Sequence, residues 1–187
     1  SKRYEEAERL IREMRAAYGD NPPPVAVRRF DRQLGLLAMI RGDLQAARDY
    51  LLTSLNDEDD PAWSGDEIMT LTLASLALNR TGDPERGQEL LERAERLIAR
   101  ARLNGVDDPS IYYSEGVVMA LNGDPEGALQ KLQQAYDRGF REEWVLEIDG
   151  RLDPLRDRPE FLLFKQQISD DLDEALFEIR SNSLVAL

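Results

Sequence analysis

The sequence of 187 residues contains neither cysteine nor histidine. Without cysteine, disulfides, thiolate nucleophiles and cysteine-based zinc sites are excluded. Without histidine, the side chain that most often serves as general base or metal ligand is missing. Basic residues are also scarce, with 24 lysines and arginines against 37 acidic residues and a net charge of −13. A surface this acidic repels phosphate backbones and anionic lipids, so we expect no direct binding to nucleic acid.

Long apolar runs and catalytic motifs are missing as well. No stretch approaches the roughly 18 consecutive apolar residues that a membrane-spanning helix requires, so we expect no membrane insertion. No Gly-rich phosphate loop or nucleophile elbow is present. Hydrophobic residues nevertheless make up 42% of the sequence and charged residues 33%, which is typical of a folded chain. We therefore expect a folded, non-enzymatic protein without catalytic residues, cofactor or metal.

Three Gly-Asp pairs divide the chain at intervals of 40 and 41 residues: Gly42-Asp43, Gly82-Asp83 and Gly123-Asp124. Glycine readily adopts the left-handed conformation that ends a helix, and aspartate caps the start of the next one. Pro84 and Pro125 follow at the first helical position, where a missing N–H is harmless. Each pair therefore predicts a tight turn between two helices.

Apolar residues on both sides of each turn recur at spacings of three and four, as on one face of a helix. Before the turns these residues include Phe30, Leu34 and Leu37, then Leu71, Ala74 and Leu78, then Tyr112 and Val118. After the turns they include Ala47, Leu51 and Leu55, then Leu91, Ala94 and Leu97, then Ala128, Leu132 and Ala135. The pattern predicts an all-α chain of helical hairpins.

The pattern resembles the tetratricopeptide repeat (TPR) family, whose paired helices carry small residues where they cross. Counted from each turn glycine, those positions fall on Gly35, Ser75 and Gly116 in the first helices, and on Ala47, Gly87, Ala128, Ser54, Ala94 and Ala135 in the second. The large aromatic positions of the family are aliphatic here, as at Leu51, Leu91 and Leu132, and the period exceeds the 34 residues of the family.

The resemblance implies a right-handed superhelix of about three and a half hairpins with a C-terminal capping helix. It divides a single domain, residues 1–187, into a half hairpin with a linker, three repeats and a capping segment. Their ranges are 1–24, 25–65, 66–108, 109–140 and 141–187. Because residues 1–24 look like the second helix of a hairpin, we expect the chain to be a piece of a longer protein.

Residues 139–161, GFREEWVLEIDGRLDPLRDRPEF, resemble the last repeat and cap of TPR regions in bacterial multi-domain regulators. Those include membrane-embedded winged-helix transcription regulators and class III-type nucleotide cyclases. This resemblance implies an interaction and regulatory module of a bacterial signalling or transcription protein, with its effector domain upstream. It is equally compatible with the cytoplasm and the periplasm.

The concave face of a repeat array is the usual binding surface. The inward positions of the family fall on a set that we predict to bind a partner: Arg29, Arg32, Met39, Met69, Thr72, Asn79, Arg80 and Tyr113. Arginine suits carboxylates, so we expect a protein or peptide partner with an acidic segment. The same arginines could instead pair with acidic neighbours. Leu36 occupies a position that is polar in the carboxylate-clamp members of the family, so that clamp is absent.

Two further functions stay open. A small-molecule or peptide sensor would bind its ligand in a pocket lined by Arg29, Arg32 and Tyr113. A homo-oligomerisation domain, such as a homodimer, would leave the apolar stripe of the last helix exposed. That stripe comprises Phe161, Phe164, Ile168, Leu172, Ala175, Leu176 and Ile179.

Two patterns have a plain structural explanation. The acidic loop of residues 56–67 has carboxylates at the spacing of a calcium loop, but Pro61 stands where the turn requires glycine, so we expect no calcium site. Tyr112, Phe140 and Trp144 form an aromatic group that we expect in the core of the last hairpin.

Overall fold

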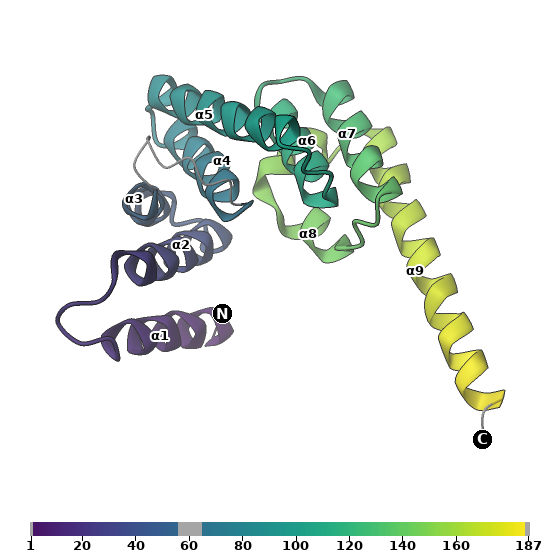
Figure 1. Cartoon of the computed structure of the whole chain (residues 1–187), viewed down its shortest axis with the longest axis horizontal. Coiled ribbons are helices and arrows are strands. Elements are labelled where there is room, and N and C mark those ends of the chain that lie inside the picture. Colours follow the sequence, from purple (N-terminus) through teal and green to yellow (C-terminus); the bar gives the residue numbers. More distant parts are fainter. Residues whose placement is uncertain (1, 56–64, 186–187) are drawn as a thin grey trace. The chain divides into compact units, whose positions relative to one another are not determined.

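The computed structural model describes residues 2–55 and 65–185, and within these ranges it confirms an all-helical chain (Figure 1). The chain falls into two compact units, Ser1–Asp107 and Asp108–Leu187, which are described separately. Most of the loop examined for calcium, residues 56–64, lies outside the described residues.

The described residues of the first unit form five helices that pack against their neighbours in sequence (Figure 1). They are α1 (Lys2–Ala16), α2 (Pro24–Arg41), α3 (Leu44–Ser54), α4 (Gly65–Arg80) and α5 (Pro84–Leu103). The pairs α2/α3 and α4/α5 form hairpins, α3 packs on α4, and α1 lies against α2. Ala38, Ala47, Leu51, Leu73, Ala74 and Ala77 form a buried cluster between α2, α3 and α4.

The described residues of the second unit form a helical hairpin, two short helical elements and a long C-terminal helix (Figure 1). Its elements are α6 (Pro109–Leu121), α7 (Pro125–Asp137), α8 (Glu143–Ile148), the 3₁₀ helix η1 (Gly150–Leu155) and α9 (Pro159–Val185). The helices α6 and α7 form the hairpin, η1 packs on α6, and α9 contacts α7 and α8. Leu132, Leu146, Leu152, Leu155 and Phe161 are buried at the centre of this unit.

The three predicted turns are confirmed. The turn glycines Gly42, Gly82 and Gly123 have φ values of +77°, +91° and +77°, the left-handed conformation that glycine adopts without strain. The aspartate after each glycine accepts a hydrogen bond from a backbone N–H in the first turn of the next helix. Asp43 accepts from the N–H of Ala46 at 3.2 Å, Asp83 from that of Arg86 at 3.4 Å, and Asp124 from that of Gly127 at 2.9 Å.

The small residues lie at helix crossings, as the repeat pattern predicted. A Cβ added to Gly35 would lie 2.6 Å from Cγ of Leu51, and one added to Gly116 would lie 3.1 Å from the carbonyl oxygen of Ala128. At Gly87 an added Cβ would lie 3.0 Å from the carbonyl oxygen of Ser75. Each hairpin therefore depends on a close approach of two backbones that a larger side chain would prevent.

The aromatic group is only partly in the core. Tyr112 is buried, with the guanidinium of Arg138 4.0 Å from the centre of its ring, and Phe140 stacks on Tyr113 at 4.7 Å. Trp144 in α8 is 63% exposed, so its predicted place in the core was wrong. The short α8 turns Leu146 rather than Trp144 toward the core of the unit. Among the described helices, none combines the length and apolar character needed to cross a membrane.

Candidate functional site

Of the three arginines of the predicted strip, Arg32 is engaged within the fold. Arg32 in α2 is half-buried and its Nη2 lies 2.6 Å from Oδ2 of Asp66, so its charge is paired within the unit. Asp66 lies in the first turn of α4 and Arg80 in the last. The helix rise of about 1.5 Å per residue separates these two residues by about 21 Å. Arg29 is exposed on α2, but Arg32 and Arg80 cannot bind one carboxylate together.

The uncharged members of the predicted surface are mostly engaged in the fold. Thr72 is fully buried and its Oγ1 donates to the carbonyl oxygen of Ile68 at 2.9 Å. Met39 and Met69 are partly buried and pack against the cluster between α2, α3 and α4. Asn79 is exposed, and its Oδ1 lies next to Gly87 of the neighbouring helix, 2.8 Å from where a Cβ of that residue would be. A partner has no access to the Thr72 hydroxyl, so its placement on a binding surface was wrong.

Tyr113 is a buried structural residue, which corrects its predicted role in partner binding. Its hydroxyl donates to Oδ2 of Asp149 at 2.5 Å, and Nη2 of Arg151 lies 2.6 Å from the same oxygen. Nε of Arg151 also donates to Asp149, at 2.9 Å to Oδ1. Both Asp149 and Arg151 are buried, and together the three side chains connect η1 to α6.

The titration of this buried triad follows from its contacts. Burial raises the pKa of the Tyr113 hydroxyl well above its ordinary value, and the charge of Asp149 raises it further. For Asp149, burial opposes ionisation, but attraction and hydrogen bonds from Arg151 outweigh it and hold the pKa below the ordinary value. Because every charge has a partner, the triad is a clasp between helices and not a reactive site. This clasp could not be predicted from the sequence, since Asp149 and Arg151 are two residues apart and show no helical pattern.

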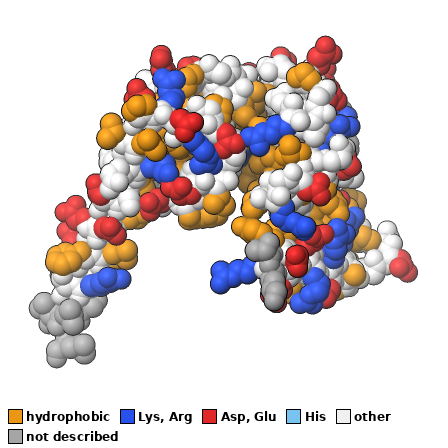
Figure 2. Space-filling model, turned by 180° about the vertical axis from the view of Figure 1, so that it is seen from behind, with side chains coloured by type: hydrophobic (Ala, Val, Ile, Leu, Met, Phe, Trp, Pro, Cys, Tyr) orange, Lys and Arg blue, Asp and Glu red, His pale blue; other side chains and the backbone are white. Residues whose placement is uncertain are grey.

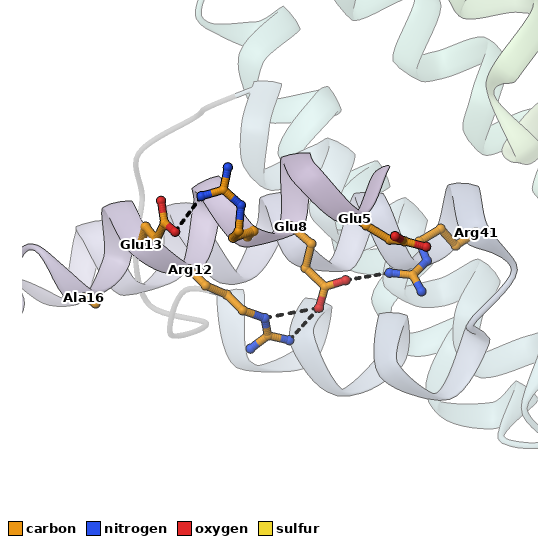
Figure 3. Close-up of a pocket in the computed structure, with 7 residues that line it drawn as sticks. Glu5, Glu8, Arg12, Glu13, Ala16 and Arg41 are labelled. Carbon is orange, nitrogen blue, oxygen red and sulfur yellow. Dashed lines mark hydrogen bonds and ion pairs between the residues drawn. The ribbon is translucent and has the colours of Figure 1, made fainter. Parts of the chain in front are cut away.

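An open depression of about 690 Å³ lies along α1 and is lined by acidic and basic residues in alternation (Figure 3). Glu8 joins Arg12 at 2.8 Å and Arg41 at 2.5 Å, as the dashed lines in Figure 3 show. Arg12 also donates to the hydroxyl of Tyr50 at 2.8 Å. The hydrogen bond from Arg12 lowers the pKa of Glu8, although burial opposes this. These charges neutralise one another and fasten α1 to α2 and α3.

A second attachment of α1 is partly buried. Nη1 of Arg15 lies 2.5 Å from Oδ1 of Asp31, which is buried in α2. Burial raises the pKa of Asp31, and the charge of Arg15 only partly offsets it. The ion pairs of Glu8 and Arg15 therefore hold α1 in place against α2.

The helix α9 packs on its unit along its first half. Phe161, Phe164 and Ile168 are buried, and the ring of Phe164 meets the ring of Tyr136 edge to face at 6.1 Å. The hydroxyl of Tyr136 donates to Asp171, and Leu172 is the last residue of the stripe that is packed against the core. The spacing from Phe161 to Leu172 follows one face of a helix.

The apolar stripe continues beyond the part that is covered. Ala175, Leu176 and Ile179 extend the same face, and Leu176 and Ile179 are 49% and 63% exposed. Phe177, which follows Leu176 in the sequence, is 72% exposed. In Figure 2 the C-terminal part of α9, at the lower left before the grey atoms, carries hydrophobic and acidic side chains together. Exposed apolar side chains at adjacent positions are typical of an interaction site.

The acidic side chains beside this stripe are not used within the unit. Asp173, Glu174 and Glu178 form no ion pair or side-chain hydrogen bond with the described part of the chain. No group of acidic side chains among the described residues has the arrangement of a metal site. Among the described residues, the second half of α9 thus combines an exposed apolar stripe with carboxylates that no other side chain engages. Comparison of the chain with models of protein families, with curated proteins and with solved structures found no match.

Proposed function

We propose that the chain is a TPR-like module that binds another protein and has no catalytic activity, as part of a bacterial signalling or transcription-regulating protein. In this proposal the hairpins of residues 25–140 belong to a right-handed superhelix, with α1 as a half hairpin and α9 as its cap. The capped Gly-Asp turns and the small residues at the helix crossings support it. The small residues are the feature by which the chain resembles the family, and the capped turns set their spacing.

The exposed half of α9 is the observation that carries a binding function. Leu176 and Ile179 continue a stripe whose earlier members are buried, so within the described part of the chain this stretch of the helix presents an exposed apolar face. Each such side chain would gain about 1.5–3 kcal/mol on full burial. Helices with anchors at this spacing commonly bind partner proteins along one face. The acidic partner expected from the arginines is not part of the proposal, because Arg32 pairs with Asp66 and Tyr113 is buried.

Site-specific photocrosslinking tests this proposal. A photoreactive amino acid is placed at Leu176 or Ile179, and at Glu92 on the exposed face of α5 as the control. The chain is then irradiated in the cells from which its gene comes. We expect an adduct of one defined mass at the two α9 positions and none at Glu92. Equal adducts at all three positions, or none at α9, would contradict the proposal.

Homo-oligomerisation is the second candidate, because the exposed stripe could also be covered by another copy of the chain. A homodimer would bury Leu176 and Ile179 in a shared interface. Sedimentation of the purified chain distinguishes the two functions. A dimer that dissociates on the change Ile179→Gln would favour self-association, and a monomer at all concentrations would favour a different protein as partner.

A further inference from the structure

The charges along the exposed half of α9 are of nearly one sign. Residues 170–180 contain five acidic residues and a single basic residue, Arg180. On a helix with 100° between residues, Asp171 and Glu178 lie on one side of the apolar stripe and Asp173 on the other. Asp171 is held by Tyr136, whereas Asp173 and Glu178 have no partner in the described residues. The stripe is therefore bordered by carboxylates that are free to contact a partner.

These charges disfavour three possible occupants. In a pair of identical α9 helices, parallel or antiparallel, the acidic borders of the two copies would face each other, and like charges across an interface are repulsive. The net charge of −13 adds long-range repulsion between copies. Anionic membranes and nucleic acids are repelled for the same reason.

The backbone of α9 limits the shape of the partner. All residues of Pro159–Val185 are helical, so this surface has no strand edge to which an extended peptide could add. A row of anchors at spacings of three and four fits the ridges of another helix. The bordering carboxylates would pair best with lysine and arginine placed beside the apolar face of that helix.

We propose that the second half of α9 binds a cationic amphipathic helix of a partner protein. Leu172, Leu176 and Ile179 contact its apolar face, and Asp173 and Glu178 pair with its basic residues. This proposal rests on the proposed function and specifies the chemistry of the partner. Since surface charges mainly accelerate association and select the partner, binding should weaken as salt is added.

A pair of designed peptides tests the proposal with the full chain. Both are helices of about 20 residues with leucine at spacings of three and four. One has lysine beside the leucine face and the other has glutamate, and both carry a fluorescent label. Fluorescence anisotropy measures their binding at low and at physiological salt. We expect the lysine peptide to bind, more weakly at higher salt, and the glutamate peptide not to bind.

Matched variants show where the peptide binds. Leu176→Gln with Ile179→Gln should weaken binding at least about tenfold, because anchors at the centre of an interface carry most of its energy. Asp173→Asn with Glu178→Gln should weaken it about threefold at low salt, as exposed ion pairs contribute little individually. The controls are Leu10→Gln with Met14→Gln, exposed apolar residues of α1, and Glu89→Gln with Glu92→Gln, exposed acidic residues of α5. Both controls should bind within about twofold of the unchanged chain, because neither pair belongs to the proposed surface.

Several results would overturn the proposal. Equal binding of the two peptides would remove the role of charge, and binding unaffected by the α9 changes would place the peptide elsewhere. A dimer that depends on Ile179 would make a second copy the occupant. If neither peptide binds while crosslinks remain confined to Leu176 and Ile179, the partner chemistry is wrong and the binding function stands. If no crosslinks form at Leu176 and Ile179 either, the proposed binding function and the proposed partner chemistry are both wrong.

Discussion

The two units each bury an aspartate between helices, but they surround it differently. In the first unit Asp31 of α2 has one charged partner, Arg15 of α1, and burial raises the pKa of Asp31. In the second unit Asp149 receives hydrogen bonds from Arg151 and Tyr113, and its pKa is lowered. Burial opposes the charge at both sites. The number and quality of the donors decides whether a buried carboxylate keeps its charge at little cost.

The two terminal helices, α1 and α9, also differ in how their charged side chains are paired. Two charges of α1 are paired with the rest of its unit, Glu8 with Arg41 and Arg15 with Asp31. In the second half of α9, Glu174 and Glu178 have no partner in the described residues. A terminal helix whose charges are satisfied internally is a structural part of the unit. One with unpaired charges beside an exposed apolar stripe is suited to binding.

The largest effect should come from removing Asp149. Asp149→Ala leaves the buried guanidinium of Arg151 without its counter-charge, so we expect the free energy of unfolding to fall by about 3–5 kcal/mol. Urea unfolding followed by circular dichroism measures this change. Arg151→Met combined with Asp149→Leu removes both charges and should recover much of the loss. A loss below about 1 kcal/mol for Asp149→Ala would mean that the clasp does not hold η1 on α6.

Substitution at a helix crossing should cost less and should affect both units in the same way. Gly35→Leu places a side chain where even a Cβ would lie 2.6 Å from Leu51, and we expect a loss of about 1–3 kcal/mol in stability. Gly116→Leu should cause a similar loss in the second unit, where the obstacle is the backbone of Ala128. The melting temperature of each variant reports the effect. Unchanged melting of both would contradict the assigned repeat positions.

Removing the ion pair between α1 and α2 tests Asp31, the buried carboxylate that has fewer hydrogen-bond donors than Asp149. Arg15→Ala leaves Asp31 buried without its partner, and we expect a loss of about 1–2 kcal/mol. Asp31→Asn removes the buried charge as well and should cost less than Arg15→Ala, because burial already disfavours that charge. Hydrogen exchange of the backbone amides of α1 follows both variants. If Asp31→Asn lost more stability than Arg15→Ala, the attraction of Arg15 for the Asp31 charge would exceed the cost of burying that charge.

The smallest effect concerns pH, and it has opposite signs in the two units. The pKa of Asp149 is lowered by folding, so its contribution is present above its unfolded pKa of about 3.9 and is lost as the pH falls through the folded value. The pKa of Asp31 is raised, so its contribution is present below about 3.9 and is lost as the pH rises through the folded value. Relative to the unchanged chain, Asp149→Asn should therefore lose more stability at neutral pH than near pH 3. Asp31→Asn should show the opposite, with the larger loss of stability near pH 3.

The local parts of the fold could be predicted from the sequence. The turns at Gly42, Gly82 and Gly123 depend on residues within one or two positions of each glycine, and so do the aspartate caps. The crossings at Gly35 and Gly116 follow from the fixed register between each turn and its two helices. Signals of this kind are complete within a short stretch of chain, so reading the sequence was sufficient.

The binding surface could not be predicted in the same way. Whether Thr72 and Tyr113 face a partner, and whether Arg32 is paired, depends on residues far away in sequence, such as Asp66 and Asp149. The spacing of the stripe on α9 identified its apolar face, but only the packing of the unit showed that the face is covered as far as Leu172 and open at Leu176 and Ile179. The sequence determined which side chains share a helix face. The tertiary structure decided which of those faces are buried, because burial depends on the neighbouring elements and not on the helix itself.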